Sequence, residues 1–517
     1  MKKVKEFLAK TKKWIKENPR EFWILIFILL LAAFARLYRI DRYMTFLGDE
    51  GRDVIVVRRL LVEGHPPLIG PGTSIGNMYL GPLYYYMMAP ALLVAGFSPL
   101  GPAVQIALLG VATVFLVWYL ARLWFGKTAA AVSAALYALS PIIIIYSRSS
   151  WNPNIMPFFS ILVIYSLWKI YKDRSYVWLT VMSISFAFVL HSHYLGLLLA
   201  PTIFLFWALS LRNIWKNKIE KKIFFKKSAI SGAILVALMS PLFFFDLRHN
   251  WINFKAMYTF FTVRQETVSI RPWKAIPKIP EMLNLVSGSV VAAKNPIATP
   301  IASVAIIFSV VWLFFKAKLK NKNFRVPAHY WLLFSWLGFA LLGFGLYKQN
   351  IYDHYFGFIF AVPILLIGDF VSRLLAGSKI LKLLGVAFFV FLIAVNLMGS
   401  PLKKEPNSLL QRTVKVAAVI EKESGGAPFN IAVIAENNYE DAYKYFLLKD
   451  NSPVMDIDAQ RTETVASQLF VVCELIPNTK CDPTHSPKAQ IANFGWSKID
   501  AQWEVEGVII YRLIHSQ

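Results

Sequence analysis

The residues from Gly48 to Asp53 (Gly-Asp-Glu-Gly-Arg-Asp) carry the strongest chemical signal in the chain. Apolar residues recur after them at helical spacing, so a helix that begins near Asp49 would place Asp49, Arg52 and Asp53 on one face. Two carboxylates beside an arginine suit a general base together with an anion or metal site. The same residues also suit a helix N-terminus, where Asp49 would cap the helix and Glu50 and Asp53 would complement its dipole.

Three corners between apolar segments offer further polar candidates. At the first corner, Arg148 could bind a phosphate and Asn152 could bind a sugar hydroxyl or a metal. A helix that stops at Asn-Pro beside an interfacial arginine explains the same residues, and on its own it is the better explanation. The candidates at the other two corners could contact a phosphate or another polar ligand, or could simply be solvated: His191, His193, Tyr352 and His354.

Cysteine chemistry is limited to Cys473 and Cys481, which stand close together near the C-terminus. Their spacing is not that of a C-x-x-C zinc or redox motif. If this part of the chain lies outside the membrane, a disulfide that closes the short loop between them is expected.

The composition indicates which elements must position these residues. Of the 517 residues, 56% are hydrophobic and only 16% are charged, whereas soluble proteins typically contain about 25% charged residues. The sequence thus predicts an α-helical polytopic membrane protein with about eleven transmembrane helices, and it excludes an intrinsically disordered chain. The apolar stretches lie at 22–35, 103–120, 129–146, 155–168, 177–190, 195–211, 229–245, 297–315, 330–346, 356–371 and 380–397.

The net charge of +25 is a topology signal rather than a nucleic-acid surface, so no nucleic-acid partner is expected. All the basic segments fall on one side if 81–97, a short stretch broken by prolines, forms a juxtamembrane or re-entrant helix instead of crossing the bilayer. The positive-inside rule then predicts a multi-pass protein of the cytoplasmic membrane with its N-terminus in the cytoplasm and its C-terminus outside. Nearly all the net charge lies in the first twenty residues and at 121–127, 169–175, 212–227, 316–325 and 373–382.

Hydropathy falls after about Pro401, which divides the chain into a membrane domain (1–402) and a small extracytoplasmic α/β domain (403–517). Ionisable residues are nearly absent from the middle of the predicted spans, although channels and proton-coupled transporters usually need them there. An enzyme that meets its substrate's head group at the outer face is therefore favoured. The alternative is a transporter or flippase of lipid-linked glycans. In the second domain, helices are expected at 409–421 and 440–448 and strands at 430–435, 468–472 and 507–513.

Three short motifs resemble the GT-C superfamily of glycosyltransferases. They are Gly48-Asp49-Glu50-x-Arg52, Gly81-Pro82-Leu83-Tyr84-Tyr85 and Arg148-x-x-Trp151-Asn152-Pro153. They are similar to the protein O-mannosyltransferase-like branch (glycosyltransferase family 39), near the aminoarabinose lipid A transferases, over roughly the first 400 residues in topology. The resemblance implies a GT-C fold with juxtamembrane helices in a long first extracytoplasmic loop.

The resemblance also implies an activity. Such enzymes transfer a sugar from a polyprenyl-phosphate donor to a lipid, glycan or protein acceptor on the extracytoplasmic face, with inversion at the anomeric carbon. Asp49 would be the catalytic carboxylate, supported by Glu50, and Arg52 would meet the donor phosphate. The substrate-binding candidates are then Arg52, Tyr84, Arg148, Asn152, His191, His193, Tyr352 and His354.

The chain departs from the aminoarabinose branch at two places. It has Asn152 where those relatives carry an aspartate before the proline, and Leu80-Gly81 where they carry Glu-Lys. The pattern therefore requires no cofactor, and a divalent metal, if one takes part, would be held by Asp49 and Glu50. Without the lysine, phosphate binding falls to others, such as Arg148, His191 or His193.

Overall fold

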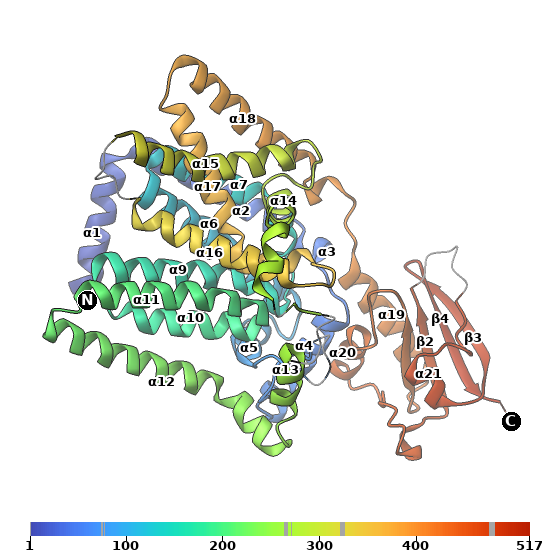
Figure 1. The fold of residues 1–517 in the computed structure, drawn as a ribbon. Coiled ribbons are helices and arrows are strands. Elements are labelled where there is room, and N and C mark those ends of the chain that lie inside the picture. Colours follow the sequence, from blue (N-terminus) through green and yellow to red (C-terminus); the bar gives the residue numbers. More distant parts are fainter. Residues whose placement is uncertain are drawn as a thin grey trace.

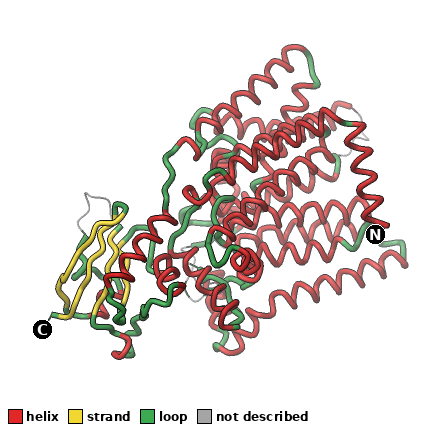
Figure 2. The backbone as a smooth tube through the Cα atoms, turned by 180° about the vertical axis from the view of Figure 1, so that it is seen from behind, coloured by secondary structure: helices red, strands yellow, loops and turns green. Residues whose placement is uncertain are grey.

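The computed structural model describes residues 2–73, 76, 78–262, 267–269, 271–320, 326–474 and 481–516. Figure 1 shows a bundle of long helices joined to a smaller domain that contains a β-sheet. The N-terminus and the C-terminus lie at opposite ends of the molecule, and the view from behind in Figure 2 shows the same arrangement.

Each of the eleven apolar stretches predicted from the sequence is helical. An amphipathic helix, α1 (Lys2–Glu17), precedes them, and α13 (Ile252–Thr262), η3 (Pro272–Lys278) and α14 (Ile279–Val290) lie between α12 and α15. The bundle contains α2 (Pro19–Leu37), α6 (Leu100–Phe125), α7 (Lys127–Leu139) with α8 (Pro141–Ile145), η1 (Asn152–Ile155) with α9 (Met156–Asp173), α10 (Trp178–Ser192), η2 (Tyr194–Leu199) with α11 (Ala200–Ile214), α12 (Lys218–Arg248), α15 (Ala298–Lys320), α16 (Ala328–Leu346), η4 (Asp353–Ile359) with α17 (Ala361–Leu375), and α18 (Lys379–Met398).

The helices differ in whether they could cross a bilayer alone. Within the described residues, six are long and apolar enough by length and composition, namely α6, η1–α9, η2–α11, α12, α16 and α18. The pair η4–α17 bends by 63° and counts as a seventh if it is one broken span. The apolar helices α7, α10 and, within α15, Ala298–Leu313 are shorter, and α2 carries Arg20, Glu21 and Arg36. The expected eleven helical segments are present, and in the described part of the chain six or seven of them are long and apolar enough to span a bilayer.

Polar contacts distinguish the two ends of the bundle. At one end the predicted basic loops pair with acidic residues: Arg122 Nε donates to Glu21 Oε1 at 2.6 Å, and Arg174 pairs with Glu220 at 3.2 Å. At the other end, where α2 and α7 finish, the buried Arg36 donates to two backbone carbonyls at the end of α7. The chain continues from this second end of α2 into the long first loop.

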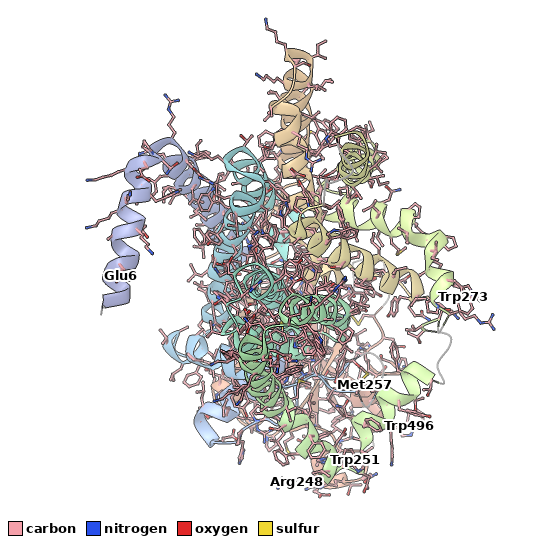
Figure 3. All side chains as sticks on the ribbon, turned by 60° about the vertical axis from the view of Figure 1, so that its left-hand side comes forward. Glu6, Arg248, Trp251, Met257, Trp273 and Trp496 are labelled. Carbon is pink, nitrogen blue, oxygen red and sulfur yellow. A yellow bond between two sulfur atoms is a disulfide. The ribbon has the colours of Figure 1, made fainter. Side chains whose placement is uncertain are left out.

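Exposed aromatic side chains lie where α12 gives way to α13. Figure 3 shows Trp251 at this corner, near Arg248 and Met257, and Trp273 on the following segment η3. Both tryptophans are exposed. Because tryptophan favours the boundary between the polar and apolar parts of a bilayer, the positions of both tryptophans fit a membrane interface.

The long loop between α2 and α6 contains α3 (Ile40–Tyr43), α4 (Gly48–Glu63) and α5 (Leu83–Val94). Between α4 and α5 the chain turns back on itself: the N–H of Gly70 donates to the carbonyl of Leu80 at 2.7 Å, and the N–H of Leu80 donates to the carbonyl of Pro71 at 2.9 Å. α5 has twelve residues, too few to span a bilayer. The loop therefore holds juxtamembrane helices, as predicted.

The C-terminal domain has a four-stranded sheet in the order β1-β2-β4-β3. β1 (Asn430–Ile434) pairs in parallel with β2 (Gln468–Cys473), whereas β4 (Val508–His515) is antiparallel to β2 and to β3 (Ser497–Val505). α19 (Leu409–Glu423) and α20 (Asp441–Lys449) cover one face, and α21 (Ala489–Phe494) covers the other. All five predicted elements are present. β3 and α21 are additional to the prediction because β3 is a largely exposed strand and α21 has only six residues.

One apolar core joins this domain to the first loop of the membrane domain. Phe470 on β2 and Ile420 on α19 belong to the same cluster of buried side chains as Val57 on α4. Phe46 packs edge-on against Phe446 with ring centroids 5.6 Å apart. The C-terminal domain is thus packed onto the α4 region, and not only connected to it through the chain.

Candidate active site

α4 begins at Gly48, after the extended residue Leu47, and its first turn holds the candidate carboxylates. Glu50 is buried, and its Oε2 accepts a hydrogen bond from the backbone N–H of Leu47 at 3.0 Å. Burial raises the pKa of Glu50 to about 7. Glu50 therefore caps the N-terminus of the helix, so the alternative prediction that Asp49 caps it is wrong.

Arg52 bridges the other two carboxylates of α4. Its Nη1 donates to Asp49 Oδ1 at 2.8 Å, while Nη2 and Nε donate to Asp53 Oδ1 at 2.8 and 3.0 Å. Asp53 is fully buried, and burial raises its pKa to about 6, although Arg52 opposes that shift. The predicted grouping of these three residues on one helix face is confirmed.

A tyrosine from the C-terminal domain completes the group. The hydroxyl of Tyr439 donates to Asp49 Oδ1 at 2.8 Å, and Arg52 Nη1 lies 3.4 Å from the same hydroxyl. A Cβ atom at Gly48 would lie 2.3 Å from the Tyr439 ring, and one at Gly51 would lie 2.4 Å from the backbone of α20. The two glycines of the motif therefore admit the C-terminal domain at close range.

Asp49 is the exposed member of the group. Its side chain is 42% exposed, against 26% for Arg52 and 0% for Asp53. Arg52 and Tyr439 both donate to Oδ1, and no group in the described part of the chain is hydrogen-bonded to Oδ2. The carboxylate thus presents one oriented oxygen to its surroundings, as a general base for a hydroxyl group requires.

Tyr84 and Tyr85 on α5 lie behind the carboxylates. The hydroxyl of Tyr85 donates to Asp53 Oδ1 at 3.2 Å, and the hydroxyl of Tyr84 shares a hydrogen bond with Ser150 Oγ at 2.5 Å. Both tyrosines are buried, and burial raises the pKa of each well above its usual value. Tyr84, a predicted substrate-binding residue, therefore bonds α5 to the 146–151 corner through a hydroxyl that is already paired, while its neighbour Tyr85 bonds the carboxylate group.

Arg148 and Asn152 are buried and bonded to the backbone. Arg148 donates to the carbonyls of Ala35 at 3.3 Å and Tyr38 at 2.6 Å, and its guanidinium lies 4.6 Å from the ring centroid of Tyr43. Asn152 Nδ2 donates to the last carbonyl of α10 at 2.7 Å. These contacts fit the helix-end interpretation of the motif, because both side chains are buried and donate to backbone carbonyls.

His191 is buried between α5 and α12. Its Nδ1 accepts a hydrogen bond from the N–H of Leu83 at 3.2 Å, and its Nε2 lies 3.1 Å from Met239 Sδ. A Cβ atom at Gly81 would lie 2.0 Å from Nδ1. The glycine that departs from the aminoarabinose pattern therefore makes room for His191, which holds the start of α5.

His193, Tyr352 and His354 belong to an aromatic cluster beyond this corner. The rings of Trp151 and His354 lie 4.6 Å apart, those of His193 and Tyr355 lie 4.9 Å apart, and Tyr352 stacks on His354 at 5.9 Å. His193 Nδ1 accepts a backbone N–H at 3.1 Å, so the proton of the neutral ring lies on Nε2. Burial, with a smaller contribution from His354, lowers the pKa of His193 to about 3. His193 can donate a hydrogen bond but brings no charge.

An apolar cavity of about 240 Å³ lies beside the aromatic cluster. The turn before α5, η2, the end of α16 and Val268 bound it, and His193 and Tyr355 form part of its wall. Leucine side chains of η2 make up much of the rest. The cavity suits a hydrocarbon chain with a neutral N–H donor at its edge.

The side chains present do not fit a divalent metal at Asp49 and Glu50. In the described ranges, no group of three or more His, Cys, Asp or Glu side chains could hold a metal ion. Arg52 already bridges Asp49 and Asp53, and Glu50 is bonded to the backbone. The metal that the sequence left open has no set of ligands at this position.

Comparison with known sequences matches part of the membrane domain. Residues 80–245 match the dolichyl-phosphate-mannose-protein mannosyltransferase family. A putative mannosyltransferase, YkcB of Bacillus subtilis (strain 168), is 25% identical over 235 residues, which are 44% of this chain and 31% of that protein. This chain therefore spans about a third of that relative's length.

Comparison with solved structures covers nearly the whole chain. ArnT from Cupriavidus metallidurans, bound to undecaprenyl phosphate, aligns with a TM-score of 0.59 at 14% identity over 96% of this chain and 98% of that one. AglB from Archaeoglobus fulgidus, an archaeal oligosaccharyltransferase in complex with an inhibitory peptide and a dolichol-phosphate, aligns with a TM-score of 0.51 at 12% identity over 89% of this chain and 70% of that one. The chain has the GT-C fold.

The resemblance to GT-C glycosyltransferases that the sequence motifs indicated is confirmed. The residues that match the family do not include the carboxylate group of α4, because Asp49 and Tyr439 are both outside residues 80–245. The match contains five of the predicted site residues, namely Tyr84, Arg148, Asn152, His191 and His193.

Tyr439 is the main residue of the candidate site that the sequence did not indicate. Nothing in its own neighbourhood marks it. Gly48 and Gly51 were the available sign, because glycine is unfavourable in a helix unless another segment approaches closely.

The predicted disulfide between Cys473 and Cys481 is present.

Proposed function

We propose that this chain is a membrane glycosyltransferase. It transfers a sugar from a polyprenyl-phosphate donor to a hydroxyl of a lipid, glycan or protein acceptor, on the extracytoplasmic side of the cytoplasmic membrane and with inversion. The GT-C fold supports this proposal, as do the undecaprenyl phosphate bound to ArnT and the dolichol-phosphate bound to AglB. The observation that carries it is the exposed Asp49 carboxylate, oriented through Oδ1 and open at Oδ2.

The reaction we assign to this geometry is a direct displacement. The acceptor oxygen attacks the anomeric carbon while its proton passes to Asp49 Oδ2. The bond between the anomeric carbon and the phosphate oxygen breaks, and its electron pair leaves with the lipid phosphate. Arg52 holds Asp49 in place, and contact with the donor phosphate would be a second role for the same guanidinium.

The donor lipid is assigned to the apolar cavity beside His193 and Tyr355. Its leucine-rich wall suits a polyprenyl chain, and the Nε2–H of His193 can donate to a phosphate oxygen. Arg148, another candidate for the phosphate, donates to two backbone carbonyls, and both ring nitrogens of His191 already have partners, Leu83 N–H and Met239 Sδ. In the described part of the chain, only Nδ1 of His193 is bonded, so its Nε2–H is available. Among the three, His193 is therefore the one we assign.

The orientation follows from the separation of charge and chemistry. The basic loops lie at one end of the bundle and Asp49 lies at the other. If the basic end faces the cytoplasm, as the positive-inside rule requires, the carboxylate group and the C-terminal domain are extracytoplasmic.

The proposal is tested with purified protein in proteoliposomes that contain undecaprenyl-phosphate hexoses and pentoses and a bacterial lipid extract. Intact-mass analysis should detect a glycosylated product and released undecaprenyl phosphate for the wild type, and neither for Asp49→Asn. Asp41→Asn is the matched control, because Asp41 lies in the same loop and its described partners are Gln411, at 3.1 Å, and Arg42, and not Arg52 or Tyr439. An active Asp49→Asn variant overturns the assignment. Movement of the lipid-linked sugar across the bilayer without a new glycosidic bond would favour the flippase.

A further inference from the structure

We propose that the C-terminal domain supplies a positioning residue for the transfer reaction: Tyr439 holds Asp49 so that its free carboxylate oxygen faces the acceptor. This inference rests on the proposed function, because it assumes that Asp49 is the base. It goes further by making the C-terminal domain part of the active site.

The contact between the two domains is specific. The Tyr439 hydroxyl and Arg52 Nη1 each donate to Asp49 Oδ1 at 2.8 Å. Two donors on one oxygen fix the plane of the carboxylate and leave Oδ2 as the oxygen that can accept a proton. Burial raises the pKa of Tyr439 far above its usual value, so its hydroxyl remains protonated and can act as a donor at any working pH.

The α4 helix is shaped to receive this tyrosine. A Cβ atom at Gly48 would lie 2.3 to 2.4 Å from three atoms of the Tyr439 ring. Because such an overlap cannot be tolerated, only glycine at this position allows the ring to pass beneath Asp49. The glycine next to the catalytic candidate is thus explained by the tyrosine and not by any turn, since it lies in a helix.

A buried network in the C-terminal domain holds Tyr439 in place. Asn438 Oδ1 accepts the backbone N–H of Tyr439 at 2.9 Å, and Asn438 Nδ2 donates to Glu474. Glu474 also accepts from Tyr443 at 2.7 Å and from Arg412. Glu474 directly follows the disulfide-bonded end of β2, so the segment that carries Tyr439 is tied to the sheet.

Other contacts hold the two domains together without Tyr439. The hydroxyl of Tyr445 on α20 donates to the carbonyl of Phe97 at 2.5 Å, and Phe46 packs against Phe446. Removing the Tyr439 hydroxyl should therefore leave the domains docked. Tyr445→Phe is the matched control, because it removes a tyrosine hydroxyl from the same domain contact without touching Asp49.

The test compares Tyr439→Phe with Tyr445→Phe in the proteoliposome assay. A hydrogen bond to a charged group is worth enough to change a rate by about tenfold to a hundredfold. Tyr439→Phe should lower kcat by about that factor and leave the KM for the donor within about twofold, whereas Tyr445→Phe should leave both unchanged.

The pH profile separates positioning from a merely structural role. Loss of a donor favours the protonated form of a carboxylate, so the acidic limb of the kcat/KM profile should move to higher pH in Tyr439→Phe and not in Tyr445→Phe. Among the described residues, the charged and titratable groups that interact with Asp49 are Glu50, Arg52, Asp53 and Tyr439, and all but Tyr439 are unchanged in this comparison.

Two results would overturn the inference. One is a Tyr439→Phe variant with wild-type kcat and pH profile while Asp49→Asn is inactive, which would leave the proposed function intact. The other is an equal loss in both tyrosine variants, which would indicate a role in docking alone. If Tyr439→Phe does not yield folded protein by gel filtration, Asn438→Ala takes its place. That variant keeps the hydroxyl but frees the segment, and it should show a smaller shift of the acidic limb in the same direction; an unshifted limb contradicts the inference.

Discussion

Replacement of Arg52 by methionine should destabilise the protein in a strongly pH-dependent way. Arg52 makes two charge-assisted hydrogen bonds to Asp53, which is fully buried and has the Tyr85 hydroxyl as its other donor. Methionine keeps the aliphatic stem of the side chain but removes every donor. Asp53 must then either stay ionised without a counter-charge or take up a proton.

The magnitude follows from the pKa of Asp53, which burial raises to about 6 even beside Arg52. An uncompensated buried charge would cost about 3–5 kcal/mol. Protonation of Asp53 in the variant costs less free energy than leaving it ionised. At pH 7.5, about 1.5 pH units above the wild-type pKa, protonating Asp53 costs about 2 kcal/mol, at about 1.36 kcal/mol per pH unit. The loss of unfolding free energy from the Arg52–Asp53 pair is therefore limited to about 2 kcal/mol. At pH 5 the carboxyl is already mostly protonated in the wild type, so almost none of this loss remains.

The raised pKa of Asp53 also determines how the stability of the wild type changes with pH. Because the folded pKa of Asp53 is raised above the unfolded value of about 3.8, its contribution favours folding most below about pH 4 and is lost as the pH rises through about 6. The Arg52→Met penalty should therefore grow between pH 5 and pH 7.5. The matched control is the same replacement made in Asp53→Asn, because that background lacks the Asp53 carboxyl, while the buried Glu50 is present in both members of the pair.

The assay is thermal unfolding of the detergent-solubilised protein, followed by tryptophan fluorescence at pH 5 and pH 7.5. The reasoning predicts that Arg52→Met lowers Tm more at pH 7.5 than at pH 5 relative to wild type, and that the same replacement made in Asp53→Asn lowers Tm equally at both pH values. An Arg52→Met effect that is the same at both pH values in the wild-type background, or one that stays pH-dependent in the Asp53→Asn background, would refute the account of Asp53.

Two further predictions concern packing and the disulfide. Gly51→Ala should cost about 1–3 kcal/mol of stability, because its Cβ would lie 2.4 Å from the backbone of Asp441; Gly232→Ala in α12, with nothing within 4 Å of its Cβ, should show no loss in the same unfolding experiment. Replacing both Cys473 and Cys481 by serine should lower the stability of the C-terminal domain by about 2–3 kcal/mol. Reductant should destabilise the wild type by the same amount and leave the double variant unchanged.

The local part of the candidate site was readable from the sequence because it lies within two turns of one helix. The spacing of Asp49, Arg52 and Asp53 predicts their shared face, and the structure shows Arg52 bonded to both carboxylates. The fold was readable for a similar reason, since hydropathy marks each apolar helix and charge marks the loops. The five predicted elements of the C-terminal domain likewise depend on local pattern.

What the sequence could not predict depends on contacts between distant segments. Tyr439 stands 390 residues from Asp49, and although Gly48 and Gly51 indicate that some segment approaches closely, one sequence does not show which segment it is. The roles of Arg148 and His191 were open for the same reason, because a cation or an imidazole at a corner has the same sequence pattern whether it meets a ligand or a backbone group. In the structure, Arg148 donates to backbone carbonyls at the end of α2, and His191 accepts a backbone N–H at the start of α5.

The most direct test of the central claim is the rate of sugar transfer by Asp49→Asn relative to wild type, measured by intact mass of the product in proteoliposomes. Loss of a general base typically lowers a rate by about 10²–10⁴-fold. The account predicts a fall in kcat of at least about a hundredfold, with folded protein and an unchanged KM for the donor. Activity within about tenfold of the wild type would contradict the assignment of Asp49 as the base.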